Sequence, residues 1–477
     1  MWETVIGLEV HVELSTKTKI FCGCSTAFGA KPNTQCCPVC MGLPGALPVF
    51  NGEVLRYATM AAIAFNCEIS KTSVFDRKNY FYPDLPKAYQ ISQLYFPIGK
   101  NGKVPIKVGD TEKVIRIHEM HMEEDAGKLI HSEYDNETYP DYNRCGVPLI
   151  EIVSEPDFRS SAEVIAYLQK IKSICEYLGI SDCKMQEGSM RVDINLSVRK
   201  KGEETFGTRT ETKNINSFRA IEHAIEHESA RQIDAIESGE RIIQQTRHWN
   251  EDKRSSYAMR SKENAQDYRY FPEPDLLPLV VTDEYIESVR ASLPEMAESR
   301  KQRFMSDYGL SDYDASLLTA SLHTAELFEK TLSKINMPKE IANWIIVPLQ
   351  KLLNERGKTL DDVSLDSDNF AEVISKVTSG KINRASGMEI LEAMVEAGGK
   401  IDVDGYIKEH SMEAIDDDGL IVDTVRKIVE ANPASVAEYK SGKTKVLGFF
   451  VGQVMKELKG KANPAKVNEA ILKELSK

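Results

Sequence analysis

Residues 2–14 read WETVIGLEVHVEL, and this stretch decides the fold of the first part of the chain. Apolar and polar side chains alternate along it, which is the pattern of a β-strand with one buried face. Because strand side chains point alternately to opposite sides, we expect Glu9, His11 and Glu13 to project from one face. Two carboxylates that flank an imidazole are groups that bind a divalent cation. A solvated outer face is the alternative interpretation.

The same alternation of apolar and polar residues recurs later in the chain. The polar residues at alternate positions are Arg191, Asp193, Asn195 and Ser197 in one segment and Arg209, Glu211 and Lys213 in the next. Residues 121–125, HMEED, add further acidic groups. These segments carry more charge than a solvated face needs and are less Lys-rich than a typical exposed sheet. We therefore expect several strands to share one polar cleft.

Two segments interleave cations with aromatic residues: DRKNYFY at 76–82 and DYRYFP at 267–272. Arg and Lys bind phosphates, whereas a purine ring stacks on Tyr or Phe. Either segment alone is only moderately specific for such a ligand.

Five of the nine cysteines lie in one short segment, CGCSTAFGAKPNTQCCPVC. Cys22-x-Cys24 is followed by twelve residues and then by Cys37-x-x-Cys40. Two close pairs of thiolates match tetrahedral zinc, and four protein ligands indicate a structural rather than a catalytic site. We expect that Cys36 does not bind the zinc, although the spacing also lets it take the place of Cys37. Plain reduced cysteines are the alternative.

The composition is that of an ordinary globular protein, with 42% hydrophobic and 28% charged residues in 477. Such a length predicts two to four domains. Glu3 and Glu9 interrupt any apolar run at the N-terminus, and no stretch reaches membrane-spanning length. We expect no signal peptide, no membrane segment and a cytoplasmic protein.

Charge is distributed unevenly along the chain. The net charge is −13, but residues 440–477 contain nine Lys and three Glu, which is +6 and leaves −19 for the rest. A small basic module on an acidic body can bind a polyanion at one place. A solubilising helix face explains the same lysines equally well.

The hydrophobic pattern of the sequence changes near Pro294, from mixed strand and helix patterns to helix patterns only. This change predicts an α+β fold. Before it, period-2 segments mix with helices, of which Ser160–Gly179 is the clearest, with a capping box at Ser160 and Glu163 and a C-cap at Gly179. Later segments such as Ala315–Leu332 are amphipathic and separated by glycines. The predicted domains are an N-terminal domain with antiparallel sheets at 1–292, an all-α domain at 293–409 and a small helical tail at 410–477.

Several well-known catalytic motifs are absent from the sequence. Gly357–Thr359 and Gly442–Thr444 resemble the end of a P-loop, but Leu352 and Ala437 stand where its first Gly is required. His118–His121 is one residue short of the zinc-protease motif, and no nucleophile elbow occurs. If the chain uses ATP, it does so outside the P-loop family. If its reaction needs ammonia, another subunit must release it.

Several segments together resemble the family of B subunits of aspartyl/glutamyl-tRNA amidotransferases, in order and from the first residues to the tail. These segments are ETVIGLEVHVEL at 3–14, CPVCMGLPGALPVFN at 37–51, RKNYFYPDLPKAYQISQ at 77–93, HMEEDAGK at 121–128, DYNRCGVPLIEIVSEPD at 141–157, MQEGSMRVDINLS at 185–197, TETKNINSF at 210–218, DYRYFPEPDLLP at 267–278 and GFFVGQVMK at 448–456.

The resemblance implies a cradle-shaped N-terminal domain, a helical domain and a helical tail that contacts tRNA. It implies a heterotrimer with an amidase (A) subunit, which releases ammonia from glutamine, and a small C subunit. The B subunit would use ATP and Mg²⁺ to phosphorylate the side-chain carboxylate of misacylated Glu-tRNA(Gln), Asp-tRNA(Asn) or both, and ammonia would then displace the phosphate. The sequence does not distinguish the two tRNA substrates.

Site residues are carried over from the family by motif. Glu9, His11 and Glu124 resemble its magnesium-binding set, and Asp193 and Glu211 resemble further catalytic carboxylates. The candidates for contacts to ATP phosphates, which rest more on chemistry than on a matched role, are Arg77, Lys78, Arg191 and Lys213. The zinc ligands expected here are Cys22, Cys24, Cys37 and Cys40.

Two other functions remain as alternatives. A free-standing, metal-dependent ligase or kinase acting on a small acid would explain the acidic cleft but not the basic tail. A non-enzymatic RNA-binding protein that docks tRNA for another enzyme would explain the tail but not the repeated acidic faces.

Overall fold

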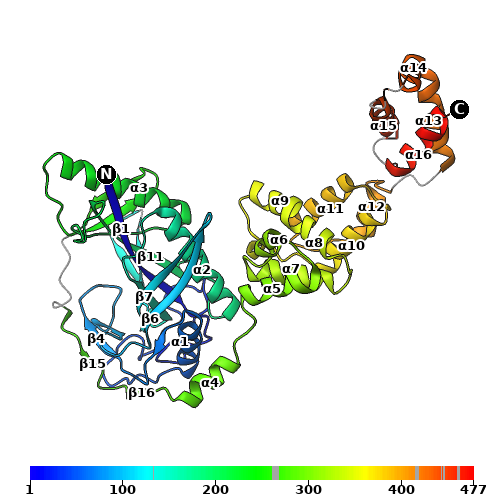
Figure 1. The fold of residues 1–477 in the computed structure, drawn as a ribbon. Coiled ribbons are helices and arrows are strands. Elements are labelled where there is room, and N and C mark those ends of the chain that lie inside the picture. The colour runs from blue at the N-terminus through cyan, green and yellow to red at the C-terminus, as the bar shows by residue number, and fades with distance from the viewer. Residues whose placement is uncertain are drawn as a thin grey trace. The chain divides into compact units, whose positions relative to one another are not determined.

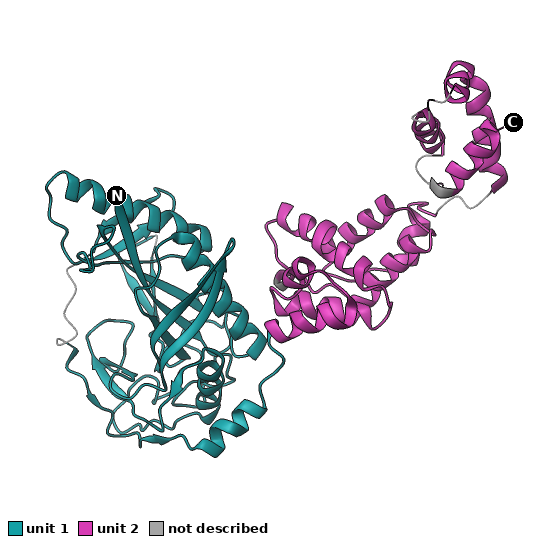
Figure 2. Ribbon diagram, in the orientation of Figure 1, with its two compact units in different colours: residues 1–296 teal, residues 297–477 magenta. Residues whose placement is uncertain are grey.

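The computed structural model describes residues 1–132, 134–259, 268–413, 418–441, 443, 446–458, 462 and 464–476. The chain divides into two compact units, residues 1–296 and 297–477 (Figure 2). The first unit contains all the strands and the second contains helices only, within the described ranges. The predicted α+β class is thereby confirmed, while the division into three domains stays a prediction.

A nine-stranded sheet forms the centre of the first unit (Figure 1). Its strands in sheet order are β14 (Ser255–Ala258), β13 (Thr246–Asn250), β12 (Thr210–Lys213), β11 (Met190–Lys200), β1 (Trp2–Glu13), β10 (Pro148–Ser154), β7 (Thr111–Glu124), β6 (Gly99–Val108) and β2 (Glu68–Ile69). Neighbouring strands are antiparallel except β12 and β13, which are parallel.

The predicted first strand, β1, lies in the middle of this sheet. Its apolar residues, such as Leu8, Val10 and Val12, are buried in the core of the unit. Helices α1 (Gly52–Ala64), α2 (Ser161–Leu178) and α3 (Phe218–Glu237) contribute to the same core (Figure 1). One face of the sheet is therefore apolar and covered, and the alternate residues of β1 are left on the other face.

Helix α2 follows the sequence pattern closely. The Ser160 side chain accepts a hydrogen bond from the Glu163 backbone N–H, and Gly179 caps the C-terminus in the left-handed conformation at φ 67°. Glu163 does not complete the expected capping box, because its carboxylate accepts from the Arg159 backbone N–H at 2.7 Å instead. The predicted helix is thus confirmed, with a modified N-terminus.

Three small sheets complete the strands of the first unit. They are β15 (Phe271–Pro272) with β4 (Asp76–Asn79) and β5 (Tyr89–Ser92), β16 (Leu279–Val280) with β3 (Thr72–Ser73), and β8 (Lys128–His131) with β9 (Thr138–Asp141). From β5, Gln90 donates to the Glu124 carbonyl at 2.7 Å and Ser92 donates to Glu123 at 3.2 Å. These bonds hold the β15-β4-β5 sheet against the end of β7. Helix α4 (Asp283–Ala291) follows near the end of the unit.

The second unit contains two separate hydrophobic cores. Elements of the first core are α5 (Ala297–Tyr308), α6 (Asp312–Leu318), α7 (Leu322–Leu332), α8 (Pro338–Trp344), the π-helix η2 (Ile345–Leu349), α9 (Gln350–Glu355), the 3₁₀-helix η3 (Leu360–Asp362), α10 (Ser367–Thr378), α11 (Arg384–Glu396) and α12 (Val403–Glu409). Elements of the second are α13 (Asp418–Ala431), α14 (Pro433–Lys440), α15 (Val446–Glu457) and α16 (Pro464–Leu475). The predicted segment Ala315–Leu332 is two helices, because Ser321 caps a new helix.

None of the helices among the described residues is both long and apolar enough to cross a membrane.

We predict that Ile152→Ala destabilises the first unit by about 2–5 kcal/mol, because Ile152 is fully buried in β10 and the substitution leaves a cavity. The control Val114→Ala, on the 52% exposed side chain of Val114 in β7, should change the free energy of unfolding by less than about 0.5 kcal/mol. Denaturant unfolding of both variants measures this. Equal losses would contradict the assigned faces of the sheet.

Candidate active site and metal centre

The polar face of the central sheet is built from residues that stand opposite one another on adjacent strands. His11 of β1 pairs with Glu151 of β10 on one side and with Arg191 of β11 on the other. One step further out, Glu151 pairs with His121 of β7. Directly opposed residues share a face, so the register alone assembles this row of charged groups. The predicted shared polar face is therefore present.

A first group of metal-ligand type consists of His11, Glu123 and Glu151, whose ligand atoms lie within 4.8 Å of one another. His11 Nε2 is 3.4 Å from Glu151 and 3.6 Å from Glu123. His121 joins them, with Nε2 3.1 Å from Glu151. Although burial alone lowers it, the charges of Glu151 and Glu123 raise the pKa of His121 to about 10. Burial opposes ionisation of Glu151, but the two histidines hold its pKa well below the usual range.

A second group consists of Glu9, Asp193 and Glu211, again with ligand atoms within 4.8 Å. Lys213 contacts Asp193 and lies 3.2 Å from Glu211. Asn195 donates to Glu9 at 2.9 Å, while its own Oδ1 is buried and accepts no hydrogen bond from the described residues. Burial and then the charges of Glu151, Glu211 and Asp193 raise the pKa of Glu9. Three carboxylates at this separation suit a hard divalent cation.

Glu13 and Asp125 form a carboxyl pair beside these groups. Burial and the charge of Asp125 raise the pKa of Glu13 to about 8, so the pair holds one proton near neutral pH. Arg191 donates to Asp125 at 2.8 Å, and Arg144 lies 3.5 Å from the same oxygen. The guanidinium charges keep the pKa of Asp125 low despite its burial. Arg191, predicted to contact phosphate, is thus anchored by a carboxylate.

The structure does not bring Glu124 together with Glu9 and His11. Glu124 is one residue beyond Glu123 in β7, so its side chain leaves the opposite face. It contacts Lys87 and accepts from the Ile91 backbone N–H at 2.9 Å. The predicted metal set is therefore divided: His11 is grouped with Glu123 and Glu151, and Glu9 with Asp193 and Glu211.

The two cations of β4 differ in their surroundings. Arg77 is held by Glu273 through two hydrogen bonds of 2.7 and 2.8 Å. The Lys78 ammonium lies 5.1 Å from the Tyr268 ring centroid and makes no ion pair in the described part of the chain. Although burial alone lowers it, the surrounding Tyr270, Glu123 and Glu151 raise the pKa of Lys78. Of the segment 267–272, Asp267 lies outside the described residues.

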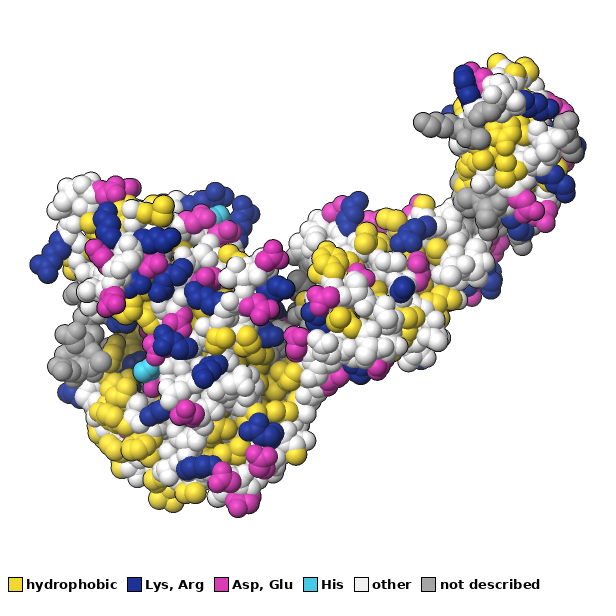
Figure 3. Space-filling model, viewed as in Figure 1, with side chains coloured by type: hydrophobic (Ala, Val, Ile, Leu, Met, Phe, Trp, Pro, Cys, Tyr) yellow, Lys and Arg dark blue, Asp and Glu magenta, His cyan; other side chains and the backbone are white. Residues whose placement is uncertain are grey.

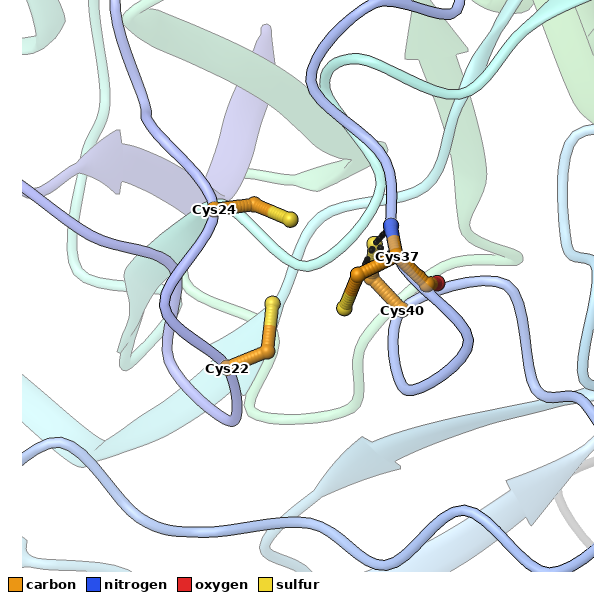
Figure 4. Close-up of side chains that lie close together, drawn as sticks. All are labelled: Cys22, Cys24, Cys37 and Cys40. Carbon is orange, nitrogen blue, oxygen red and sulfur yellow. Dashed lines mark hydrogen bonds between the residues drawn. The ribbon is translucent and has the colours of Figure 1, made fainter.

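The four expected zinc ligands form one group in the loops after β1. Cys22 and Cys24 come from one segment and Cys37 and Cys40 from another, and their sulfur atoms point toward one another (Figure 4). All four sulfur atoms lie within 4.8 Å, and those of Cys37 and Cys40 are 3.9 Å apart. Zn–S bonds of about 2.3 Å in a tetrahedron require sulfurs about 3.8 Å apart. The set therefore fits zinc with little rearrangement.

Cys36 is outside this sulfur group, whereas its neighbour Cys37 is inside it. The Cys36 thiol points to Asn143, 3.8 Å from Oδ1. Within the group, a hydrogen bond from Cys22, with help from the Cys37 backbone N–H and the charge of Lys19, lowers the pKa of Cys40 to about 4. One thiolate is thus favoured even without a metal.

The sequence analysis placed Asn195 and the HMEED segment in the shared polar cleft without giving Asn195, His121 or Glu123 a role, and it missed Glu151. Glu123 and His121 stood in the quoted HMEED segment, and their alternation with Met120 and Met122 was a usable signal. Glu151 sits in the apolar run PLIEIVS, where a lone carboxylate on a strand was the signal. Their convergence depends on register between strands, which no single segment encodes.

We predict that Cys37→Ser removes one equivalent of zinc from the purified chain and that Cys36→Ser retains it, because only Cys37 belongs to the sulfur group. Zinc per chain is measured by elemental analysis after removal of loosely bound metal. Loss of zinc in the Cys36 variant alone would reverse the ligand assignment.

Comparisons with known proteins cover both units of the chain. Residues 4–287 match the family model of the GatB/GatE catalytic domain, and residues 326–475 match that of the GatB domain. The chain is 54% identical over 477 residues to the aspartyl/glutamyl-tRNA(Asn/Gln) amidotransferase B subunit of Lachnoclostridium phytofermentans, covering 100% of this chain and 99% of the relative. It is 52% identical over 476 residues to the protein of the same name from Caldanaerobacter subterraneus subsp. tengcongensis, with 100% of both covered. The resemblance inferred from the motifs is confirmed, and the chain belongs to the family of tRNA-dependent amidotransferase B subunits.

Proposed function

We propose that this chain activates and amidates an amino acid that is already esterified to tRNA, as part of a glutamine-hydrolysing amidotransferase. Its substrates are Glu-tRNA(Gln), Asp-tRNA(Asn) or both, and its products are Gln-tRNA(Gln) and Asn-tRNA(Asn). The observation that carries the proposal is the pair of metal-ligand groups on one polar face, in a chain that matches this family over its whole length.

A side-chain carboxylate does not react with ammonia directly, because oxide would have to leave. Phosphorylation of the carboxylate by ATP supplies phosphate as a workable leaving group. The site must then stabilise negative charge on the transferring phosphoryl group and exclude water from the acyl phosphate. Phosphorylation therefore needs cations near the phosphates, and the later attack by ammonia needs a cavity that excludes water.

The residues present fit divalent cations in both groups. Buried carboxylates within 4.8 Å of one another repel each other, which the raised pKa of Glu9 reflects. The Oδ1 of Asn195 beside Glu9 has no hydrogen-bond partner among the described residues. This oxygen can coordinate a hard cation directly or accept a hydrogen bond from a water bound to the cation. We propose that Mg²⁺ bound by His11, Glu123 and Glu151, and by Glu9, Asp193 and Glu211, neutralises charge on the phosphates of ATP.

We propose that three side chains bind phosphate oxygens: Arg191 and Lys213 on the polar face of the central sheet, and Lys78 of β4 in the β15-β4-β5 sheet. Lys78 has no carboxylate partner among the described residues and is held against aromatic rings. The buried Nε of Arg191 has no hydrogen-bond partner among the described residues. Lys213 bridges Asp193 and Glu211 and would move with them when a cation binds. Arg77 is engaged by Glu273, so its predicted phosphate contact has the least support of the four.

The proposed partners rest on the family to which the chain belongs. No amidase nucleophile motif occurs in the sequence, and we propose that an amidase subunit supplies the ammonia. From the family resemblance we also propose that a small C subunit joins the two in a heterotrimer. We also propose a structural Zn²⁺ at the four cysteines. Placement in the cytoplasm stays a prediction.

The basic helical tail is proposed to bind tRNA. On the visible face of residues 1–296, acidic and basic side chains are interspersed (Figure 3). The lysine excess of the sequence is instead concentrated after residue 440. Of those lysines, Lys445, Lys459, Lys461 and Lys477 lie outside the described residues. A tail that carries the phosphate contacts makes affinity depend steeply on salt.

We predict that Glu151→Gln lowers amide formation on the order of 100-fold, because the neutral amide removes the carboxylate shared by His11 and His121. The assay uses the chain co-purified with its two partners, misacylated Glu-tRNA, ATP, Mg²⁺ and ammonium chloride, so that no glutaminase is needed. The matched control Glu155→Gln changes a carboxylate near the end of β10 that bonds His118, outside both groups.

Amide formation at the wild-type rate in Glu151→Gln would refute the assignment of this site.

The same assay with Glu124→Ala tests the role of Glu124 that was carried over from the family. Amidation of free glutamate in place of Glu-tRNA would support the small-acid ligase. Retained tRNA binding without any product from the wild-type chain, on either aminoacyl-tRNA, would support the docking protein.

We predict that Lys456→Ala with Lys473→Ala weakens tRNA binding at every tRNA sequence. The slope of log affinity against log salt should fall by about 1 for each phosphate that the variant no longer neutralises. The control Lys351→Ala changes a 68% exposed lysine outside the tail and should leave both quantities unchanged. Filter binding across a salt series measures them. An unchanged slope in the tail variant would contradict a tail that contacts phosphates.

A further inference from the structure

Lys19 is a buried cation without a carboxylate partner. Its side chain is fully buried and is among the largest fully buried side chains of the chain. The ammonium donates to Cys40 Sγ at 3.6 Å and to the Tyr142 carbonyl at 3.2 Å. Within the part of the chain that the structure describes, no Asp or Glu forms an ion pair with it.

An ammonium removed from water is costly unless an anion lies next to it. The Tyr142 carbonyl does not provide that anion, and Cys40 provides it only as a thiolate. Four thiolates around one divalent cation carry two net negative charges, and a sulfur of that group is the atom Lys19 contacts. The counter-charge of Lys19 is thus largest when the metal site is filled.

We propose that Lys19 is the built-in counter-cation of a zinc tetrathiolate formed by Cys22, Cys24, Cys37 and Cys40. This inference rests on the zinc site of the proposed function and adds to it a residue that holds no metal itself. Lys19 acts by positioning: it donates to a ligand sulfur and halves the net negative charge of the site.

The backbone holds Lys19 in register with the sulfur ligands. Its N–H donates to the Cys24 carbonyl at 3.0 Å, so one ligand segment fixes its position. The next residue, Ile20, donates to the Gly146 carbonyl at 3.0 Å. Gly146 adopts φ 84°, and a Cβ there would lie 3.5 Å from Lys19 Cδ and 3.6 Å from Cys40 Cβ. A glycine is needed at this turn, which closes over the buried lysine.

The charge balance matters beyond the metal, because the same atoms form a wall of a cavity of about 130 Å³. Lys19, Cys22 and Cys40 line it together with Lys87 and Glu124. An uncompensated tetrathiolate would repel the Glu124 carboxylate across this space. The ammonium of Lys19 reduces that repulsion, as Lys87 does by direct contact with Glu124.

The test compares zinc affinity and thermal stability in the 477-residue chain. Lys19→Met removes the charge at nearly constant volume, and Lys19→Arg keeps the charge. Lys17→Met is the control, since Lys17 is an exposed lysine two residues away. Competition with a chromogenic chelator measures Zn²⁺ affinity, and Co²⁺ substitution reports the geometry of the sulfur site by its absorption bands.

We expect Lys19→Met to bind Zn²⁺ about 10- to 100-fold more weakly than the unchanged chain, Lys19→Arg to restore part of the loss, and Lys17→Met to match the unchanged chain. The melting temperature separates this role from packing. With zinc bound, Lys19→Met should melt lower than the unchanged chain. After zinc removal the loss of melting temperature should be smaller, because fewer thiolates then remain beside the buried ammonium.

Equal Zn²⁺ affinity in Lys19→Met and the unchanged chain would overturn the inference while leaving the zinc site intact. A loss of melting temperature that is the same with and without zinc would also overturn it, because a packing role alone predicts that result. A failure of the zinc site itself is distinguishable, since the unchanged chain would then carry no zinc and Cys37→Ser would change nothing.

Discussion

The antiparallel pairing of β1 between β10 and β11 is the interaction on which the functional half of the molecule depends. Eleven residue pairs align β1 with β11 and five align it with β10. The register sets the apolar residues of β1 against the helices and places Glu9 and His11 opposite Asp193, Arg191 and Glu151. A shift by one residue would turn every one of these side chains to the other face. One strand register therefore determines both which side chains are buried in the core and which side chains meet in the site.

Carboxylates on the polar face of the central sheet lie close together and repel one another. A bound cation would reduce this repulsion. Burial and neighbouring carboxylates raise the pKa of Glu9 and of Glu13, which is paired with Asp125, whereas the histidines hold the pKa of Glu151 low. The apolar face of the sheet and the β15-β4-β5 sheet restrict water around these groups, so each charge acts in a low dielectric. Under the proposed function, divalent cations and the phosphates of a nucleotide would complete this face and supply the chemistry that activation of a carboxylate requires.

At the cysteine group and Lys19, negative groups and a cation again lie together in a buried site. There the negative charge comes from thiolates, and a buried ammonium is built into the fold beside them. Since Glu124 and two of the cysteines line one cavity, the cysteine group and the end of β7 are parts of one local arrangement. The spacing of the cysteines predicted the sulfur group, but the buried lysine became visible only with the side chains in place.

The sequence by itself determined the elements and much of the chemistry. Period-2 alternation identified β1 and the polar faces of β11 and β12, caps at Ser160 and Gly179 bounded α2, and paired cysteines named the sulfur ligands. These features are local, so a single segment carries them. Only the tertiary structure decided the partners: Glu123 and Glu151 join His11, Glu124 turns to Lys87, and Cys36 stays out. Such choices depend on which strand lies next to which and in what register, and that arises from burial of the whole sheet at once.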